Sequence, residues 1–162
     1  MAAPVSKEEA LALFIGEQYT NYYSYKFSDK TWNWAAFFGQ WVWFAYRKMY
    51  RLATLVALSS LVMLLFNLSI FMSVEIDKPL LFAIGVFTLF IPGVCASEGN
   101  RFYKRFCLQK VEQILATPAE NKELREMLKE EGGTDEILAW GLGIGTALPI
   151  IAVIAMWMYL PR

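Results

Sequence analysis

Few side chains in this sequence could carry out chemistry, and their spacing does not bring them together. The chain has no histidine, and its two cysteines, Cys95 and Cys107, lack the spacing of a metal-binding or redox pair. The usual ligands of zinc, haem and most transition metals are therefore missing. Neighbouring acids such as Glu130-Glu131 and Asp135-Glu136 diverge at helix ends, which disfavours a general acid–base pair. We expect no enzymatic activity, no catalytic or metal-binding residue and no cofactor.

The apolar composition of the chain indicates a membrane protein. Of its 162 residues, 57% are hydrophobic and 16% are aromatic, which is too apolar for an ordinary soluble domain. Three runs contain no charged residue, namely 22 residues at 52–73, 17 at 80–96 and 24 at 137–160. About 20 residues of helix cross a bilayer, so we expect one all-α membrane domain, 1–162, in which these runs form three transmembrane helices. The second run is short and contains Pro92-Gly93, so a re-entrant segment is its alternative.

The positive charges predict an orientation. Of the 15 Lys and Arg residues, six precede residue 52 and seven lie between Arg101 and Lys129. Because positive charge accumulates on the cytoplasmic side of a membrane, we expect a cytoplasmic N-terminal segment, 1–31, a cytoplasmic helical loop, 97–136, and a periplasmic C-terminus. The net charge is zero, which leaves no general attraction for nucleic acid, so we expect no nucleic-acid partner.

The segment 32–51 is rich in aromatic and basic residues. Such side chains concentrate in the headgroup layer, where amphipathic rings and cations reach water. Asn33, Gln40 and Arg47 recur at every seventh position, which predicts an amphipathic aromatic helix lying in the membrane interface. A re-entrant hairpin broken at Gly39 is the alternative. The expected interface anchors are Trp32, Trp34, Trp41, Trp43, Tyr46, Arg47, Lys48 and Arg51.

Two charged regions are expected to form short cytoplasmic helices. Ser6-Lys7-Glu8-Glu9 has the pattern of a capping box and predicts that a helix begins there. The loop 97–136 should contain one helix after Asn100 and a second, amphipathic one at about 118–131. Gly132-Gly133-Thr134-Asp135 should then end the second helix and cap the next.

A few residues in or near the apolar runs are candidates for contacts with other helices or with lipid. Asn67 lies in the first run, where an amide usually bonds to a neighbouring helix. Gly141 and Gly145 are four residues apart in the third run and would allow another helix, of this chain or of another subunit, to approach closely. A basic cluster after the second run would either contact anionic lipid headgroups or form a solvated face, and it consists of Arg101, Lys104 and Arg105.

Several motifs resemble a known family. The aromatic motif consists of Trp32-Asn33-Trp34-Ala35-Ala36-Phe37-Phe38, Trp43 and Tyr46-Arg47-Lys48-Met49-Tyr50, and it is similar to the signature of bacterial membrane proteins grouped as domain of unknown function 2628. Later landmarks of that family resemble Gly99-Asn100-Arg101-Phe102-Tyr103 and Gly132-Gly133-Thr134. The chain has Gln40-Trp41 where the family usually has Gly-Pro. The resemblance implies a bacterial inner-membrane protein, without a reaction, substrate or catalytic residue.

These observations favour a non-catalytic protein of the bacterial inner membrane that serves as an accessory, assembly or scaffolding subunit of a larger complex. Its partners would be the lipid bilayer and either other membrane protein subunits or further copies of itself. The alternative is a small oligomeric channel or transporter component, with a pore lined by Asn67, Ser59 and Thr88. The apolar runs carry no ionisable residue, which disfavours an ion or proton pathway.

Overall fold

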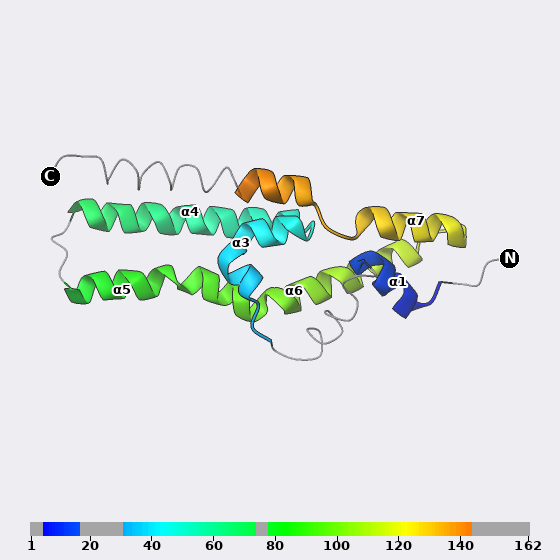
Figure 1. The fold of residues 1–162 in the computed structure, drawn as a ribbon, viewed down its shortest axis with the longest axis horizontal. Coiled ribbons are helices and arrows are strands. Elements are labelled where there is room, and N and C mark those ends of the chain that lie inside the picture. The colour runs from blue at the N-terminus through cyan, green and yellow to red at the C-terminus, as the bar shows by residue number, and fades with distance from the viewer. Residues whose placement is uncertain (1–4, 17–30, 74–77, 144–162) are drawn as a thin grey trace.

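The computed structural model describes residues 5–16, 31–73 and 78–143, and the regular structure in these ranges is helical (Figure 1). No strand occurs within them, so the predicted all-α class is confirmed for this part of the chain. A short helix at 136–143 follows the labelled ones. In chain order, the labelled helices are α1 Lys7–Ile15, α3 Trp34–Tyr46, α4 Tyr50–Ser73, α5 Lys78–Thr88, α6 Phe90–Leu115 and α7 Asn121–Glu131.

Within the described residues, two helical stretches are long and apolar enough to cross a membrane, Tyr50–Ile70 and Phe82–Leu115. We call α4 and α5 the apolar arm, because their large side chains lie on the surface: Val62 is 66% exposed and Phe82 is 75% exposed. Water-soluble proteins rarely expose a continuous apolar surface of this kind. The third charge-free run begins in the helix at 136–143, and its residues 144–160 lie outside the described ranges. A third span therefore stays a prediction.

A turn at Leu89 separates α5 from α6, and Pro92 accounts for it. Proline has no N–H to donate, and its ring crowds the carbonyl group four residues earlier, here that of Thr88, where α5 ends. The chain then resumes as α6, which runs for 26 residues. The boundary that the sequence placed at 96–97, between the second apolar run and the loop, consequently lies inside a single helix.

The aromatic segment does not form the continuous helix that its sequence favoured. The backbone breaks at Gln40, whose φ of 40° and ψ of −121° are not helical. Such a conformation costs a residue with a side chain about 1–3 kcal/mol, which packing must offset. The break lets the first half of α3 lie against α6 while the second half runs beside the start of α4 (Figure 1). Gln40 is also held in place, because the Ser60 hydroxyl of α4 lies 3.2 Å from its side-chain oxygen.

One end of the molecule is a compact unit formed by α1, α7 and residues 106–115 of α6, and we call it the helical cap (Figure 1). Its interior contains Phe14, Cys107 and Leu128, each at most 1% exposed. As predicted, Ser6 caps the first helix, accepting a hydrogen bond from the Glu9 N–H at 3.1 Å.

Gly132 lets α7 end directly against α1. A Cβ atom at this position would lie 2.1 Å from the Phe14 carbonyl oxygen, a distance that no side chain tolerates. The next residue, Gly133, has a φ of 72° and donates its N–H to the same oxygen at 2.7 Å. Asp135 then accepts from the Leu138 N–H at 3.0 Å and so caps the helix at 136–143, as the sequence predicted.

Candidate functional site

Two buried asparagines join α3 to α6, and we call this region the α3–α6 junction. Asn33 and Asn100 are each 3% exposed. The Asn33 amide nitrogen donates to the Asn100 side-chain oxygen at 2.8 Å, and the Asn33 oxygen caps α3 by accepting from the Ala36 N–H at 2.9 Å. The Asn100 nitrogen donates to the carbonyl and hydroxyl oxygens of Thr31, both at 3.1 Å. Each side-chain amide is thus engaged at nitrogen and oxygen, as buried polar groups usually are.

The junction also depends on close approach of the two helix backbones. The Asn33 N–H donates to the Ala96 carbonyl at 3.0 Å. A Cβ atom on Gly99 would lie 3.1 Å from the Ala36 Cβ, so a larger residue would push the helices apart. The aromatic motif and the motif Gly99-Asn100-Arg101-Phe102-Tyr103 therefore meet here, and the contact between them positions α3 rather than a reacting group.

The polar face of α3 lies toward the protein and not toward the surface, while the position of this helix in a membrane interface stays a prediction. Asn33 is buried at the junction, Gln40 accepts a hydrogen bond from α4, and Arg47 is only 5% exposed. On the other side of α3, Trp34 is 63% exposed and Phe38 is 76% exposed. The spacing of seven identified the polar face correctly, but this face makes its hydrogen bonds and ring contacts inside the protein.

Arg47 and Trp43 pack against Tyr103 of α6. The Arg47 guanidinium lies 5.1 Å from the centre of the Tyr46 ring and 5.2 Å from that of Tyr103. Trp43, 7% exposed, meets Tyr103 edge-on with ring centres 6.2 Å apart. A desolvated cation over an aromatic ring is stabilised by about 2 kcal/mol. Trp43 and Arg47, assigned to interface anchoring from the sequence, are therefore interior residues.

An exposed group of rings surrounds the start of α3, and we call it the aromatic surface. It consists of Trp32, Trp34 and Phe38, which are 41%, 63% and 76% exposed. The rings contact one another, with Trp32 edge-on to Trp34 at 5.7 Å and Trp34 stacked on Phe38 at 6.0 Å. Trp41 is half-buried beyond the break. These rings remain available to an apolar or interfacial environment.

The remaining expected anchors surround the turn between α3 and α4, where the aromatic segment meets the end of α7. The Tyr46 carbonyl accepts from the Asp135 N–H at 2.9 Å, and Tyr46 is half-buried. Lys48 has a φ of 58°, and its Nζ donates to the Glu130 carbonyl at 2.7 Å. Arg51 is exposed in the first turn of α4. This turn is therefore fixed at two points, to Glu130 of the helical cap and to Asp135 just beyond α7.

The three residues expected to pack between helices have different positions. Asn67 donates its amide N–H to the Thr88 hydroxyl of α5 at 3.0 Å, which is the kind of interhelical bond expected of it. A Cβ atom on Gly141 would meet no described atom within 4 Å, so no close helix contact occurs at this glycine within the described part of the chain. Gly145 lies outside the described residues.

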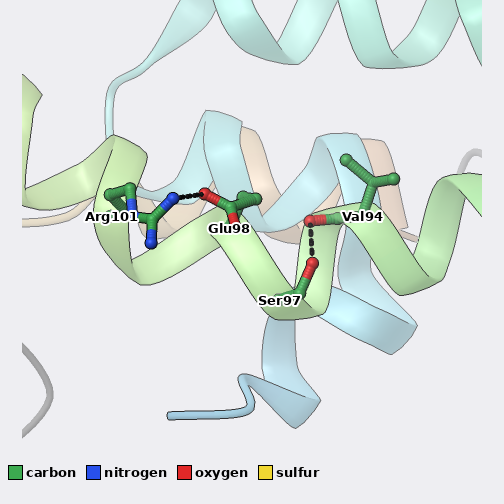
Figure 2. A network of polar contacts seen from close by, with 4 residues as sticks. All are labelled: Val94, Ser97, Glu98 and Arg101. Carbon is green, nitrogen blue, oxygen red and sulfur yellow. Dashed lines mark hydrogen bonds and ion pairs between the residues drawn. The ribbon is translucent and has the colours of Figure 1, made fainter. Parts of the chain in front are cut away.

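The basic cluster after the second apolar run lies on α6. Arg101, Lys104 and Arg105 share one face of this helix, because they are spaced three and four residues apart. Figure 2 shows that the Arg101 guanidinium turns toward Glu98, with a nitrogen–oxygen distance of 2.6 Å. The Arg101 charge is thus partly neutralised within its own helix. Contact of this cluster with lipid headgroups stays a prediction.

A groove of about 960 Å³ lies between the break in α3, the middle of α4 and the turn between α5 and α6. Its polar side chains are Gln40, Ser60, Asn67 and Thr88, among apolar and aromatic neighbours. Ser59, which the sequence placed with this polar set, instead donates to the Leu55 carbonyl of its own helix at 2.9 Å and does not line the groove. No described residue that lines it is ionisable, so it offers hydrogen bonds and no acid–base pair.

The pairing of Asn33 with Asn100 could not be read from the sequence, although Asn33 lies in the aromatic motif and Asn100 in the motif Gly99-Asn100-Arg101-Phe102-Tyr103. An asparagine among aromatic and apolar residues indicates a buried hydrogen bond. The two positions are 67 residues apart, and nothing in a single sequence pairs them. The glycine directly before Asn100 was the available indication of a close helix approach at that point.

A comparison of this chain with protein-family models, curated proteins and solved structures finds no match. The resemblance carried by the aromatic motif therefore stays a prediction. Within the described ranges, no three His, Cys, Asp or Glu side chains are grouped so that they could bind a metal ion.

Proposed function

We propose that this chain is a non-catalytic integral membrane protein that serves as an accessory, assembly or scaffolding subunit of a larger membrane complex. The contrast between the two ends of the molecule carries the proposal. The helical cap has a buried core and ion pairs of its own, whereas the apolar arm directs large aliphatic and aromatic side chains outward. Such a surface is stable only when lipid or other apolar helices cover it.

In the proposed arrangement, three segments cross the inner membrane of a bacterium: α4, α5 with the start of α6, and residues 137–160. The helical cap lies in the cytoplasm and the C-terminus lies in the periplasm. The concentration of Lys and Arg before α4 and in the loop 97–136 supports this orientation. The aromatic surface supports insertion, but not its direction, because Trp side chains favour the headgroup layer on both sides of a membrane.

Cysteine labelling tests this orientation. Cys95 and Cys107 are 3% and 0% exposed, so both should react slowly with a membrane-impermeant thiol reagent and give a low background. Lys122→Cys, at an exposed position of α7, should be labelled in inverted membrane vesicles and not in intact cells. Glu75→Cys, in the predicted periplasmic connection, should show the opposite pattern. Labelling of Lys122→Cys from outside intact cells would reject the proposed orientation.

The accessory role is tested by extracting the full chain from its native membrane in a mild detergent, measuring the particle mass and identifying every chain in it. Defined additional subunits support the proposal, and a particle containing this chain alone contradicts it. Gly141→Leu then tests where the contact lies, because a Cβ atom there meets no described atom within 4 Å. Gly85→Leu is the matched control, since its position in α5 is equally open. Loss of partner with Gly141→Leu alone would place the contact at residues 136–143.

A second candidate is a small oligomeric channel or transporter component, and the polar side chains of the groove favour it. Copies arranged with their grooves inward would line a path with Gln40, Ser60, Asn67 and Thr88. Purified protein reconstituted in vesicles should then conduct ions or small polar solutes. Asn67→Leu should change that flux, while Ser59→Ala, outside the groove, should not. Flux that is absent, or that is insensitive to Asn67→Leu, would reject this candidate.

A further inference from the structure

A second cavity, of about 510 Å³, lies where the start of α4 meets α6, and we call it the basic cavity. Its chemistry differs from that of the groove. No acidic side chain is found among the described residues that line it. One part of its wall is cationic or amide-bearing and the other part is apolar or aromatic. The wall consists of Lys48, Arg51, Lys110, Gln109 and Gln113, together with Met49, Tyr50, Leu52 and Phe106.

The three cations of the basic cavity retain hydrogen-bond donors. Lys48 gives one N–H to the Glu130 carbonyl at 2.7 Å, and Lys110 pairs with Glu131 at 2.9 Å. An ammonium group has three donors, so each lysine keeps two for another acceptor. Arg51 is exposed, and no ion pair links it to another residue in the part of the chain that the structure describes. Its five N–H donors can therefore engage an added anion.

The acids that contact this region are already engaged. Glu131 accepts from Lys110, and Asp135 accepts from the Tyr50 hydroxyl at 2.9 Å. The first turn of α4 adds positive polarity, because the opening N–H groups of a helix lack partners within it. Lys48 lies just before this turn and has a backbone φ of 58°, which is uncommon for a residue with a side chain. Several hydrogen-bond donors thus line one cavity.

We propose that the basic cavity binds the phosphate group of an anionic phospholipid. Arginine binds phosphate oxygens through paired N–H groups, and lysines add charge. The apolar wall suits the glycerol and first acyl carbons, because Leu52 opens the charge-free run of α4. The inference rests on the membrane insertion proposed above. It places a headgroup site on residues other than Arg101, Lys104 and Arg105.

Native mass spectrometry of the full chain in a non-ionic detergent tests the site. Dioctanoyl phosphatidylglycerol should bind more tightly than the zwitterionic dioctanoyl phosphatidylcholine. Arg51→Gln should weaken phosphatidylglycerol binding about fivefold, and the double variant Arg51→Gln/Lys110→Gln about 25-fold, since each cation near a headgroup contributes a similar increment. Arg51→Lys should retain part of the affinity. Lys122→Gln, at an exposed position of α7, is the matched control and should bind as the unaltered chain does.

Each result bears on the proposal. Equal binding of the two lipids, or unchanged binding by the double variant with an unaltered helical circular dichroism spectrum, would overturn it. Displacement of the lipid by inorganic phosphate at comparable concentration would assign the cavity to a free anion and overturn the lipid source. Alkaline carbonate extraction of native membranes tests insertion separately. A chain that stays in the membrane but shows no lipid preference refutes the cavity proposal alone.

Discussion

The helical cap and the apolar arm bury their side chains to very different extents. In the cap, three helices enclose Phe14 and its neighbours, and Arg125 pairs with Glu9 at 2.9 Å. In the arm, α4 and α5 meet through an Asn67–Thr88 hydrogen bond and through the Phe66 and Phe87 rings, whose centres are 5.9 Å apart. The cap is therefore stabilised by contacts among its own residues. The arm depends on what surrounds it.

The α3–α6 junction links these regions and shares features with both. Its asparagine pair is buried, as the apolar core of the cap is, while the aromatic surface beside it is exposed, as the arm is. A surface helix of a water-soluble protein turns its apolar face toward the core, whereas the helix α3 turns its polar face toward the protein. Such an arrangement is favourable when the outer surroundings are less polar than the protein interior, as they are in a bilayer.

Gly132→Ala is expected to have the largest effect, and on the cap alone. The new methyl group would lie 2.1 Å from the Phe14 carbonyl oxygen, so α7 must move away from α1 at a cost of about 3 kcal/mol. Hydrogen exchange should accelerate in α1 and α7 and stay unchanged in α4. The control, Gly85→Ala in α5, has open space around it and should change neither. Equal acceleration in α4 would mean that the cap and arm are not separate units.

Asn100→Leu should have the next largest effect on stability, because it acts on the α3–α6 junction between the two regions. It removes the partner of the Asn33 amide and leaves a buried donor unsatisfied, which costs about 1–3 kcal/mol. We expect faster hydrogen exchange in the first half of α3. Ser97→Ala is the control. Among the described residues, this exposed hydroxyl bonds only to the Val94 carbonyl of its own helix, at 3.3 Å (Figure 2). Its loss should change the free energy of unfolding by less than about 0.5 kcal/mol. Equal effects of the two variants would contradict a structural role for the asparagine pair.

Asn67→Leu should have a smaller effect, confined to the arm. Hydrogen bonds between membrane helices contribute on average about 0.6 kcal/mol, so the thermal midpoint of the protein in bilayers should fall only slightly. Ser69→Ala, which removes a bond to the Phe66 carbonyl within α4, serves as the comparison. A loss as large as that of Asn100→Leu would show that the arm is organised internally, like the cap.

Acidification should produce the smallest effect, through Glu9. The side-chain hydrogen bond from Arg125 holds the Glu9 pKa below its ordinary value. A group whose pKa is lower in the folded state stabilises the fold above its unfolded pKa and loses that contribution as the pH falls through the folded value. The protection factors of the α1 amides, which correct for the intrinsic pH dependence of hydrogen exchange, should therefore fall slightly as the pH falls below the ordinary glutamate pKa of about 4.3. Glu9→Gln should remove this pH dependence, and a dependence that persists would assign it to another carboxyl group.

Local signals in the sequence predicted many of the helices. Ser6 and Asp135 cap helices where their spacing indicated, and the charge-free run 52–73 lies within α4. These features depend on residues at most a few positions apart or on an uninterrupted apolar run. The continuous helix favoured over 32–51 was wrong, because the backbone breaks at Gln40, one residue after Gly39, where the alternative placed a break.

The candidate sites were harder to predict than the helices. Arg47 and Trp43 are residue types typical of interface anchors, yet both pack against Tyr103, which is distant in sequence. The basic cavity likewise combines Arg51 with Lys110 from another helix. A basic cluster is visible in a sequence when its members are neighbours on one helix, as at residues 101–105. A cluster assembled across helices is visible only in the fold.

The uninterrupted course of α6 has a mechanical consequence. At 1.5 Å per residue, its 26 residues form a rod about 39 Å long that begins at the Leu89 turn and ends inside the cap. A 10° tilt about that turn would displace the far end by about 7 Å on this length. Since α1 and α7 pack on that end, they would move with it. Because α3 is hydrogen-bonded to the same helix at the α3–α6 junction, α3 and the charged end of the molecule would reorient together with α6.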